Sequence, residues 1–132
     1  MTRINCVPPS ELCDQHLVAE YRELPRVFTL ASRACERGGP KKLPDAYTMG
    51  KGHVLFFYDK LDYLKSRHYA LVNEMLARGM RPSFPEPPAV DLGKSWRKNW
   101  TPDEAALAVN RARIHDRLAD MAASGRPGRF PS

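Results

Sequence analysis

The sequence lacks a long hydrophobic run. No segment approaches the roughly 18 to 20 consecutive apolar residues that a membrane-spanning helix requires. The first residues are polar, and no apolar segment typical of a secretion signal follows them. We therefore expect a cytoplasmic protein that does not associate with membranes.

Cysteine is scarce as well. The three cysteines (Cys6, Cys13 and Cys35) are an odd number without CxxC spacing, so neither a disulfide framework nor a zinc knuckle is indicated. The four histidines are scattered, and no pair with metal-ligand spacing has a third ligand beside it. We expect free thiols and neither a metal ion nor an organic cofactor.

Acidic residues are the minority charge. Lys and Arg total 21 against 15 Asp and Glu, which gives a net charge of +6 and a pI near 9.5. A pI this high suggests a polyanionic binding partner, and nucleic acid is the usual one. Charge alone is weak support for DNA binding, because many basic proteins bind nothing specific.

The 132 residues contain no internal repeat and suit one domain, 1–132, with one modest core. Apolar residues recur at helical spacing in three stretches, which predicts an all-α fold of three main helices joined by long irregular loops. The expected helices run from about Glu11 to Arg37, from about Lys60 to Arg78, and from the capping box at Thr101 to near Ser124.

Capping residues, proline and glycine predict where these helices begin, bend and end. Residues 1–9 should form an extended arm packed between the helices, with Ser10 as the N-cap of the first one. Pro25 lies inside that helix and should kink it beside Glu23, because proline lacks the N–H that would bond the Tyr21 carbonyl. Asp59 is the expected cap of the second helix, and Gly79 should end it.

The apolar residues of the second and third helices predict which faces are buried. In the third helix, small and apolar residues from Ala105 to Met121 indicate close packing. Trp96 and Trp100 are more typical of core residues than of base-stacking platforms. The buried side of the second helix is predicted to contain Leu61, Leu64, Tyr69, Val72, Met75 and Leu76.

Two long blocks in this chain carry a family resemblance. The first comprises Thr2-Arg3-Ile4-Asn5 and most of the stretch from Ser10 to Phe28, and the second runs from Gly50 to Leu61. Both resemble the phage-type endonuclease V family, the pyrimidine-dimer DNA glycosylases. The resemblance covers roughly the first 80 residues, with a divergent gap at 29–48. The C-terminal tail lacks the Trp-Tyr-rich ending of the phage protein, and that ending is associated with recognition of the dimer.

The resemblance implies roles for individual residues. The positions that match catalytic ones are Thr2 and Glu23, and Arg3, Arg22 and Arg26 match residues that hold the damaged strand. Phosphate-contacting positions on the third helix match Arg113 and Arg117. Lys51 lies in a Gly-Lys-Gly turn whose backbone amides suit phosphate, although a plain turn is equally consistent with it.

The implied reaction uses the α-amine of Thr2, which we expect to be free after removal of Met1. An α-amine has a reference pKa of about 8, so a neutral fraction exists at neutral pH. It would displace the base from a sugar of a cyclobutane dimer, form an imine and cut the strand by β-elimination, with Glu23 transferring protons. The implied partner is double-stranded damaged DNA, bound by a monomer at the nucleoid.

Simpler interpretations stand beside these roles. From charge patterning alone, Arg22, Glu23 and Arg26 would form a solvated helix flank with an ordinary ion pair. His16 is more typical of a hydrogen-bonded structural histidine than of a catalyst. Tyr21 matches a position near the family's active site, and its role stays open.

Two other functions remain compatible with the sequence. One is a lyase or glycosylase that acts on abasic sites or other damaged bases, and the other is a non-catalytic DNA-binding protein that uses the same basic residues.

Overall fold

The computed structural model describes residues 3–39 and 42–131. These ranges contain three α-helices: α1 (Asp14–Glu36), α2 (Leu61–Ala77) and α3 (Glu104–Ala123). Three short 3-10 helices precede them: η1 (Pro9–Glu11), η2 (Leu55–Phe57) and η3 (Lys94–Trp96). The described residues form no sheet, only a lone antiparallel bridge between Lys60 and Arg97. The predicted all-α fold is confirmed.

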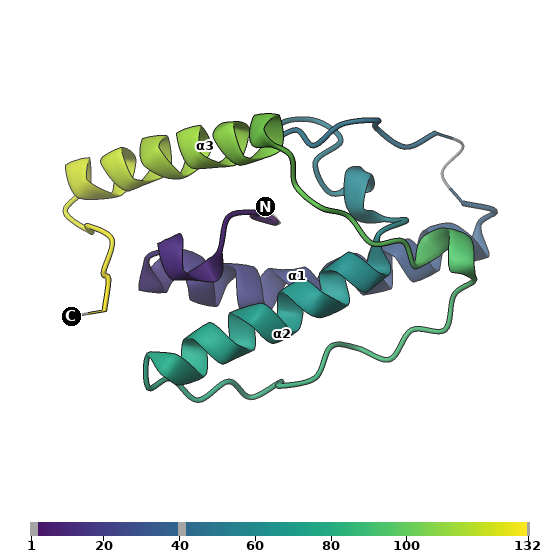
Figure 1. Ribbon diagram of the computed structural model, residues 1–132, viewed down its shortest axis with the longest axis horizontal. Coiled ribbons are helices and arrows are strands. Elements are labelled where there is room, and N and C mark those ends of the chain that lie inside the picture. Colours follow the sequence, from purple (N-terminus) through teal and green to yellow (C-terminus); the bar gives the residue numbers. More distant parts are fainter. Residues whose placement is uncertain (1–2, 40–41, 132) are drawn as a thin grey trace.

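The N-terminal arm is enclosed by the three helices. α1 and α2 lie side by side, α3 runs along the other side of the arm, and the arm passes between them (Figure 1). Ile4 and Val7 of the arm are fully buried, as are Leu17 and Leu24 of α1 and Leu64 of α2. The arm therefore belongs to the core, as the sequence predicted.

The start of α1 differs from the prediction. Leu12 is extended and separates η1 from α1, so Ser10 is not the N-cap, and the actual N-cap residue, Cys13, makes no side-chain cap hydrogen bond. Instead, the amide of Asp14 donates to the carbonyl of Arg129 at 2.6 Å. The C-terminal tail thus satisfies an amide at the start of α1, which a pattern based on neighbouring residues cannot reveal.

Two further cap predictions are wrong. Asp59 does not cap α2, since its carboxylate binds the ammonium groups of Lys60 and Lys98 at 3.0 and 3.3 Å. α3 begins after Asp103 rather than Thr101, because the Asp103 carboxylate accepts from the Ala106 amide at 2.8 Å and satisfies the third amide of the helix.

Glycines mark the C-terminal ends of α1 and α2. Gly38 and Gly79 have φ angles of 91° and 83°, a left-handed conformation that favours glycine, and each directly follows the C-cap residue of its helix. Pro25 lies inside α1, which continues through it. The kink expected beside Glu23 stays a prediction.

The buried faces of α2 and α3 differ from those predicted. Tyr69 and Leu76 are 36% and 57% exposed, because each directly follows a buried residue and successive helical side chains point about 100° apart. On α3 the buried residues are Ala106 and Asn110. The close packing predicted for α3 is therefore wrong, since the exposed residues there include Ala105, Ala108, Val109 and Ala112.

An aromatic cluster anchors the loop before α2. The Trp100 ring lies 5.6 Å from the Tyr47 ring and 5.1 Å from the rings of Phe56 and Tyr63. Trp96 and Trp100 are both half-buried against the core, as the sequence indicated. The three cysteines are free, and no helix in the described part of the chain is long and apolar enough to cross a bilayer.

Candidate active site

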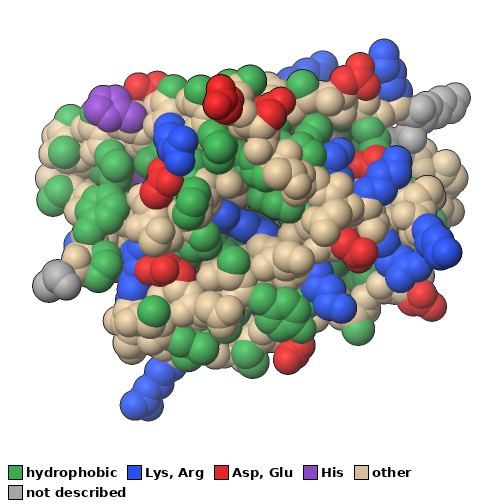
Figure 2. Space-filling view, viewed as in Figure 1, with side chains coloured by type: hydrophobic (Ala, Val, Ile, Leu, Met, Phe, Trp, Pro, Cys, Tyr) green, Lys and Arg blue, Asp and Glu red, His purple; other side chains and the backbone are tan. Residues whose placement is uncertain are grey.

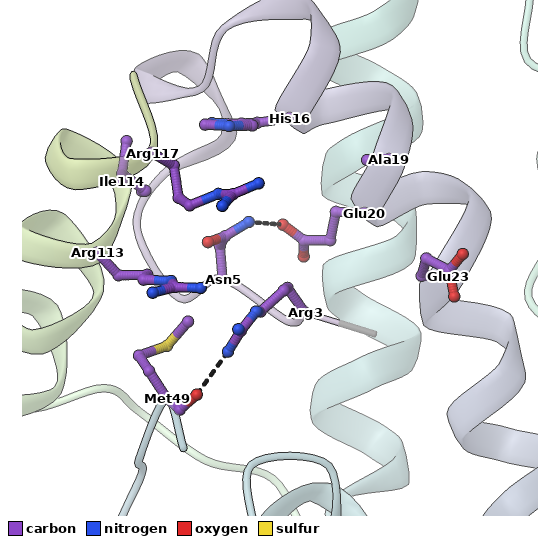
Figure 3. A pocket seen from close by; sticks show the side chains of 10 residues that line it. All are labelled: Arg3, Asn5, His16, Ala19, Glu20, Glu23, Met49, Arg113, Ile114 and Arg117. Atoms are coloured by element: carbon purple, nitrogen blue, oxygen red, sulfur yellow. Dashed lines mark hydrogen bonds between the residues drawn. The ribbon is translucent and has the colours of Figure 1, made fainter. Parts of the chain in front are cut away.

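A pocket of about 460 Å³ lies between the arm, α1 and α3. Figure 3 shows side chains from all three elements around it, with Arg113 and Arg117 on α3 facing the arm and α1. α3 is far from the arm and α1 in sequence, so the pocket exists only in the folded chain. Its lining residues are Arg3, Asn5, His16, Ala19, Glu20, Glu23, Met49, Arg113, Ile114 and Arg117.

Three guanidinium groups converge on this pocket. Arg3 donates a hydrogen bond to the Met49 carbonyl at 2.5 Å. Burial lowers the pKa of Arg3, and the positive charges of Arg113 and Arg117 lower it further. The Nε of Arg113 is buried and has no hydrogen-bond partner among the described residues. Like charges held this close favour an anion between them.

Two glutamates of α1 line the pocket in different environments. Glu20 is 2% exposed, and its oxygens accept from Arg67 at 2.7 and 3.0 Å and from Asn5 at 2.8 Å. The Glu23 side chain is 32% exposed and pairs with Arg26 at 2.9 Å. The Glu20 carboxylate is thus occupied by buried partners, while Glu23 is the carboxylate that a ligand in the pocket can reach.

His16 is the half-buried histidine of the pocket. Burial lowers the pKa of His16, and the charge of Arg117 lowers it further, so the imidazole is neutral at neutral pH. It lies on α1 above Arg117 in Figure 3, one to two turns before Glu20 and Glu23.

The structure brings together five of the residues singled out from the sequence: Arg3, His16, Glu23, Arg113 and Arg117. Arg26 reaches the pocket only through its ion pair with Glu23. Arg22 and Lys51 are exposed and do not line the pocket. Thr2 lies outside the described residues, and in the chain it directly precedes Arg3.

Tyr21 belongs to a different part of the molecule. It is 6% exposed, its hydroxyl accepts from the Phe84 amide at 2.6 Å, and its ring stacks on those of His68 and Phe84. These contacts fix the loop after α2 against α1. They give Tyr21 a structural role and leave it outside the pocket lining.

Sequence reasoning missed the buried polar residues Glu20, His53, Arg67 and Asn110, although three of them carry a signal. Arg67 lies three residues after Leu64 and four before Leu71, at the spacing of the buried face, and Asn110 lies four residues after buried Ala106. A polar residue at a predicted core position requires partners. Glu20 shows the same spacing, since it lies three residues after buried Leu17 and four before buried Leu24. His53 carried no comparable pattern.

Positive charge is not gathered in one patch on the face that Figure 2 shows. On the face in Figure 2, Lys and Arg side chains are interspersed with Asp and Glu. The pocket is where cationic side chains converge from separate elements. In the described part of the chain, no three His, Cys, Asp or Glu side chains gather where they could share a metal ion.

The same residues fall within a known family. A family model described as "Pyrimidine dimer DNA glycosylase" matches residues 1–85 of the 132. The matched range contains the arm, α1 and α2, and it ends before α3. This match confirms the family that the two sequence blocks indicated. The chain belongs to the pyrimidine dimer DNA glycosylase family.

Proposed function

We propose that the protein removes the 5′ base of UV-induced cyclobutane pyrimidine dimers from double-stranded DNA and then cuts the strand as an abasic-site lyase. The observation that carries this proposal is the pocket, which joins a reachable carboxylate, Glu23, to the converging cations Arg3, Arg113 and Arg117. A deoxyribose with its flanking phosphates presents the complementary chemistry, an electrophilic carbon between two anions.

The nucleophile in this proposal is the α-amine of Thr2, exposed by removal of Met1. Its nitrogen attacks C1′ of the sugar, a bond from nitrogen to C1′ forms, and the glycosidic bond breaks so that the base leaves with its electron pair. Loss of an amine proton and opening of the sugar ring give an imine. The imine acidifies the C2′ hydrogen, and its removal expels the 3′ phosphate by β-elimination.

Glu23 would accept and return the protons in these steps. Its carboxylate would also stabilise the positive charge that develops on the sugar as the base departs. The ion pair with Arg26 holds the carboxylate in one orientation while leaving it partly exposed. The scheme requires neither a metal ion nor an organic cofactor.

We also propose that the functional domain is the whole chain, 1–132. α3 lies outside the family match, yet it supplies Arg113 and Arg117 to the pocket and binds the arm through Asn110. A chain that ends after the matched residues would lose one wall of the pocket.

Phosphate contact by α3 gives a testable prediction. Arg113→Ala should weaken binding to all DNA sequences and reduce the slope of log K against log salt by about 0.9, the contribution of one phosphate contact. Fluorescence anisotropy across a salt series would measure the slope. Arg37→Ala, an exposed arginine just after α1, is the matched control and should leave the slope unchanged. An unchanged slope for Arg113→Ala would place this residue away from phosphate.

Borohydride trapping tests the function itself. Borohydride reduces an imine to a stable amine, so the wild-type protein should become covalently attached to DNA that carries an abasic site. DNA binding without any adduct would favour the non-catalytic alternative. Intact-mass measurement of the protein would show whether Met1 has been removed, which the proposed amine requires.

The damage preference needs a second comparison. Nicking of UV-irradiated plasmid should exceed nicking of undamaged plasmid and should begin without prior depurination. Nicking of depurinated plasmid alone would favour the lyase that acts on abasic sites or other damaged bases.

A further inference from the structure

The backbone of the arm is held by side chains rather than by a neighbouring strand. The Ile4 amide donates to His53 and the Ile4 carbonyl accepts from Tyr47, at 2.8 and 2.9 Å. The amides of Cys6 and Val7 both donate to Asn110, at 2.7 and 3.1 Å. Each of these side chains is buried, so the bonds are shielded from water and restrict where the arm can lie.

His53 lies at the end of this series that is nearest to the chain start. Its side chain is 4% exposed, and its Nδ1 is 2.7 Å from the carbonyl of Thr48. A carbonyl only accepts, so Nδ1 carries the proton and Nε2 is the acceptor for the Ile4 amide. One ring therefore ties the arm to the loop at 48–53.

The charges around His53 maintain this arrangement. Burial lowers the pKa of His53; the bond to the Thr48 carbonyl opposes that shift, Arg3 adds to it and Glu20 again opposes it, with a lowered pKa as the result. The ring is therefore neutral at neutral pH, which keeps Nε2 free to accept. Among the described residues, the rings that pack edge-on to it are those of Tyr47 and Phe57, and both are neutral.

The arm matters because the proposed nucleophile stands two residues before Ile4. Consecutive Cα atoms are about 3.8 Å apart, so fixing Ile4 and Arg3 limits the volume in which an amine at residue 2 can be found. Covalent catalysis depends steeply on such placement, and a displacement of about 1 Å can cost on the order of 100-fold in rate.

We propose that His53 is a positioning residue for imine formation: it fixes the Ile4 amide and so directs the N-terminal amine toward the sugar. This inference rests on the proposed function. His53 touches neither the sugar nor the base in this scheme, and it does not line the pocket.

Two conservative variants of His53 distinguish its hydrogen bond with the Ile4 amide from its hydrogen bond with the Thr48 carbonyl. Glutamine can place an amide oxygen near the position of Nε2 and keep an acceptor for Ile4. Asparagine reaches only the position of Nδ1 and keeps the bond to Thr48. A role that is merely structural predicts similar losses for both variants, whereas positioning predicts that His53→Gln retains activity and His53→Asn does not.

The readout is the single-turnover rate of borohydride trapping at saturating concentrations of abasic-site duplex. His53→Asn should lower this rate by about 100-fold and His53→Gln by less than about 10-fold, with the Kd for DNA unchanged in both. His68→Gln is the matched control, because His68 is also buried and bonds a backbone carbonyl, that of Phe84, away from the arm. It should lower the melting temperature without changing the trapping rate.

A backbone variant removes the same hydrogen bond by changing its donor, the Ile4 amide, instead of its acceptor, His53. Cys6 permits ligation of a synthetic peptide, residues 2–5, to residues 6–132, so the Ile4 amide can be replaced by an ester in the full chain. The ester removes the hydrogen that His53 accepts and leaves every side chain in place. The trapping rate should fall as it does in His53→Asn, relative to the ligated protein with a normal amide.

The outcomes are distinct. Equal trapping rates for His53→Asn and the wild type, or for the ester and the amide, would overturn the positioning role while leaving the proposed function intact. If the His53 variants do not fold, the ester alone decides. Absence of trapping in the wild type would refute the proposed function, and this inference with it.

Discussion

Glu23→Gln is expected to abolish strand cleavage of UV-irradiated DNA while DNA binding is retained. The amide cannot take up the protons that the carboxylate would accept, and it offers no charge to the positive sugar. Loss of a general acid–base group typically costs 100- to 10,000-fold in rate, on the order of 3–5 kcal/mol of activation free energy. The side-chain volume is preserved, and the amide oxygen can still accept from Arg26, so the helix surface should be unaltered.

Two measurements check this result. Single-turnover nicking gives the rate constant, and anisotropy with an uncleaved duplex gives the Kd. Glu36→Gln is the matched control, because it makes the same change of charge at an exposed glutamate of α1 outside the pocket. It should leave the nicking rate unchanged. A nicking rate for Glu23→Gln equal to that of the wild type would remove Glu23 from the mechanism.

The helices of this fold could be predicted because each is encoded locally. The bounds expected for the second helix, about Lys60 to Arg78, differ by one residue at each end from those observed for α2. Apolar spacing and a terminal glycine suffice for this. The cap of α1 could not be predicted, because the Asp14 amide finds its partner at Arg129, over a hundred residues away.

The pocket could be predicted only in part, for a similar reason. Arg3, Glu23 and Arg113 came from the family resemblance, which compares residue types at positions and says nothing of their partners. The distinction between Glu20 and Glu23 depends on Arg67, which pairs with the first and not with the second. Glu20 lies between Leu17 and Leu24 at the spacing of the buried face, but the sequence does not reveal that Arg67 is the cation that pairs with it there.

The buried ion pair of Arg67 and Glu20 should also contribute strongly to the stability of the fold. Arg67 donates to Glu20 at 2.7 and 3.0 Å and to the Val7 carbonyl at 2.5 Å, and both charged side chains are almost fully buried. Burial alone would lower the pKa of Arg67, but the Glu20 carboxylate outweighs this effect and raises it. Arg67 therefore remains charged inside the protein.

Arg67→Met should lower the free energy of unfolding by about 3–5 kcal/mol, because it leaves the Glu20 charge buried without its cation and the Val7 carbonyl without its donor. For a chain of this size, the melting temperature should fall by on the order of 10–20 °C. Urea denaturation at pH 7 would measure the loss. A loss below about 1 kcal/mol would mean that the Glu20 carboxylate finds water or another partner when Arg67 is gone.

The double variant Glu20→Gln with Arg67→Met separates charge from packing. It removes the unpaired carboxylate, so it should be more stable than Arg67→Met alone, although it loses one more ionic group than that variant. The Asn5 amide keeps an acceptor in the glutamine, which preserves the link from α1 through the arm to Asn110 on α3. If the double variant is instead the less stable one, the carboxylate stabilises the fold by itself, through Asn5, and the ion pair is not what holds α1 to α2.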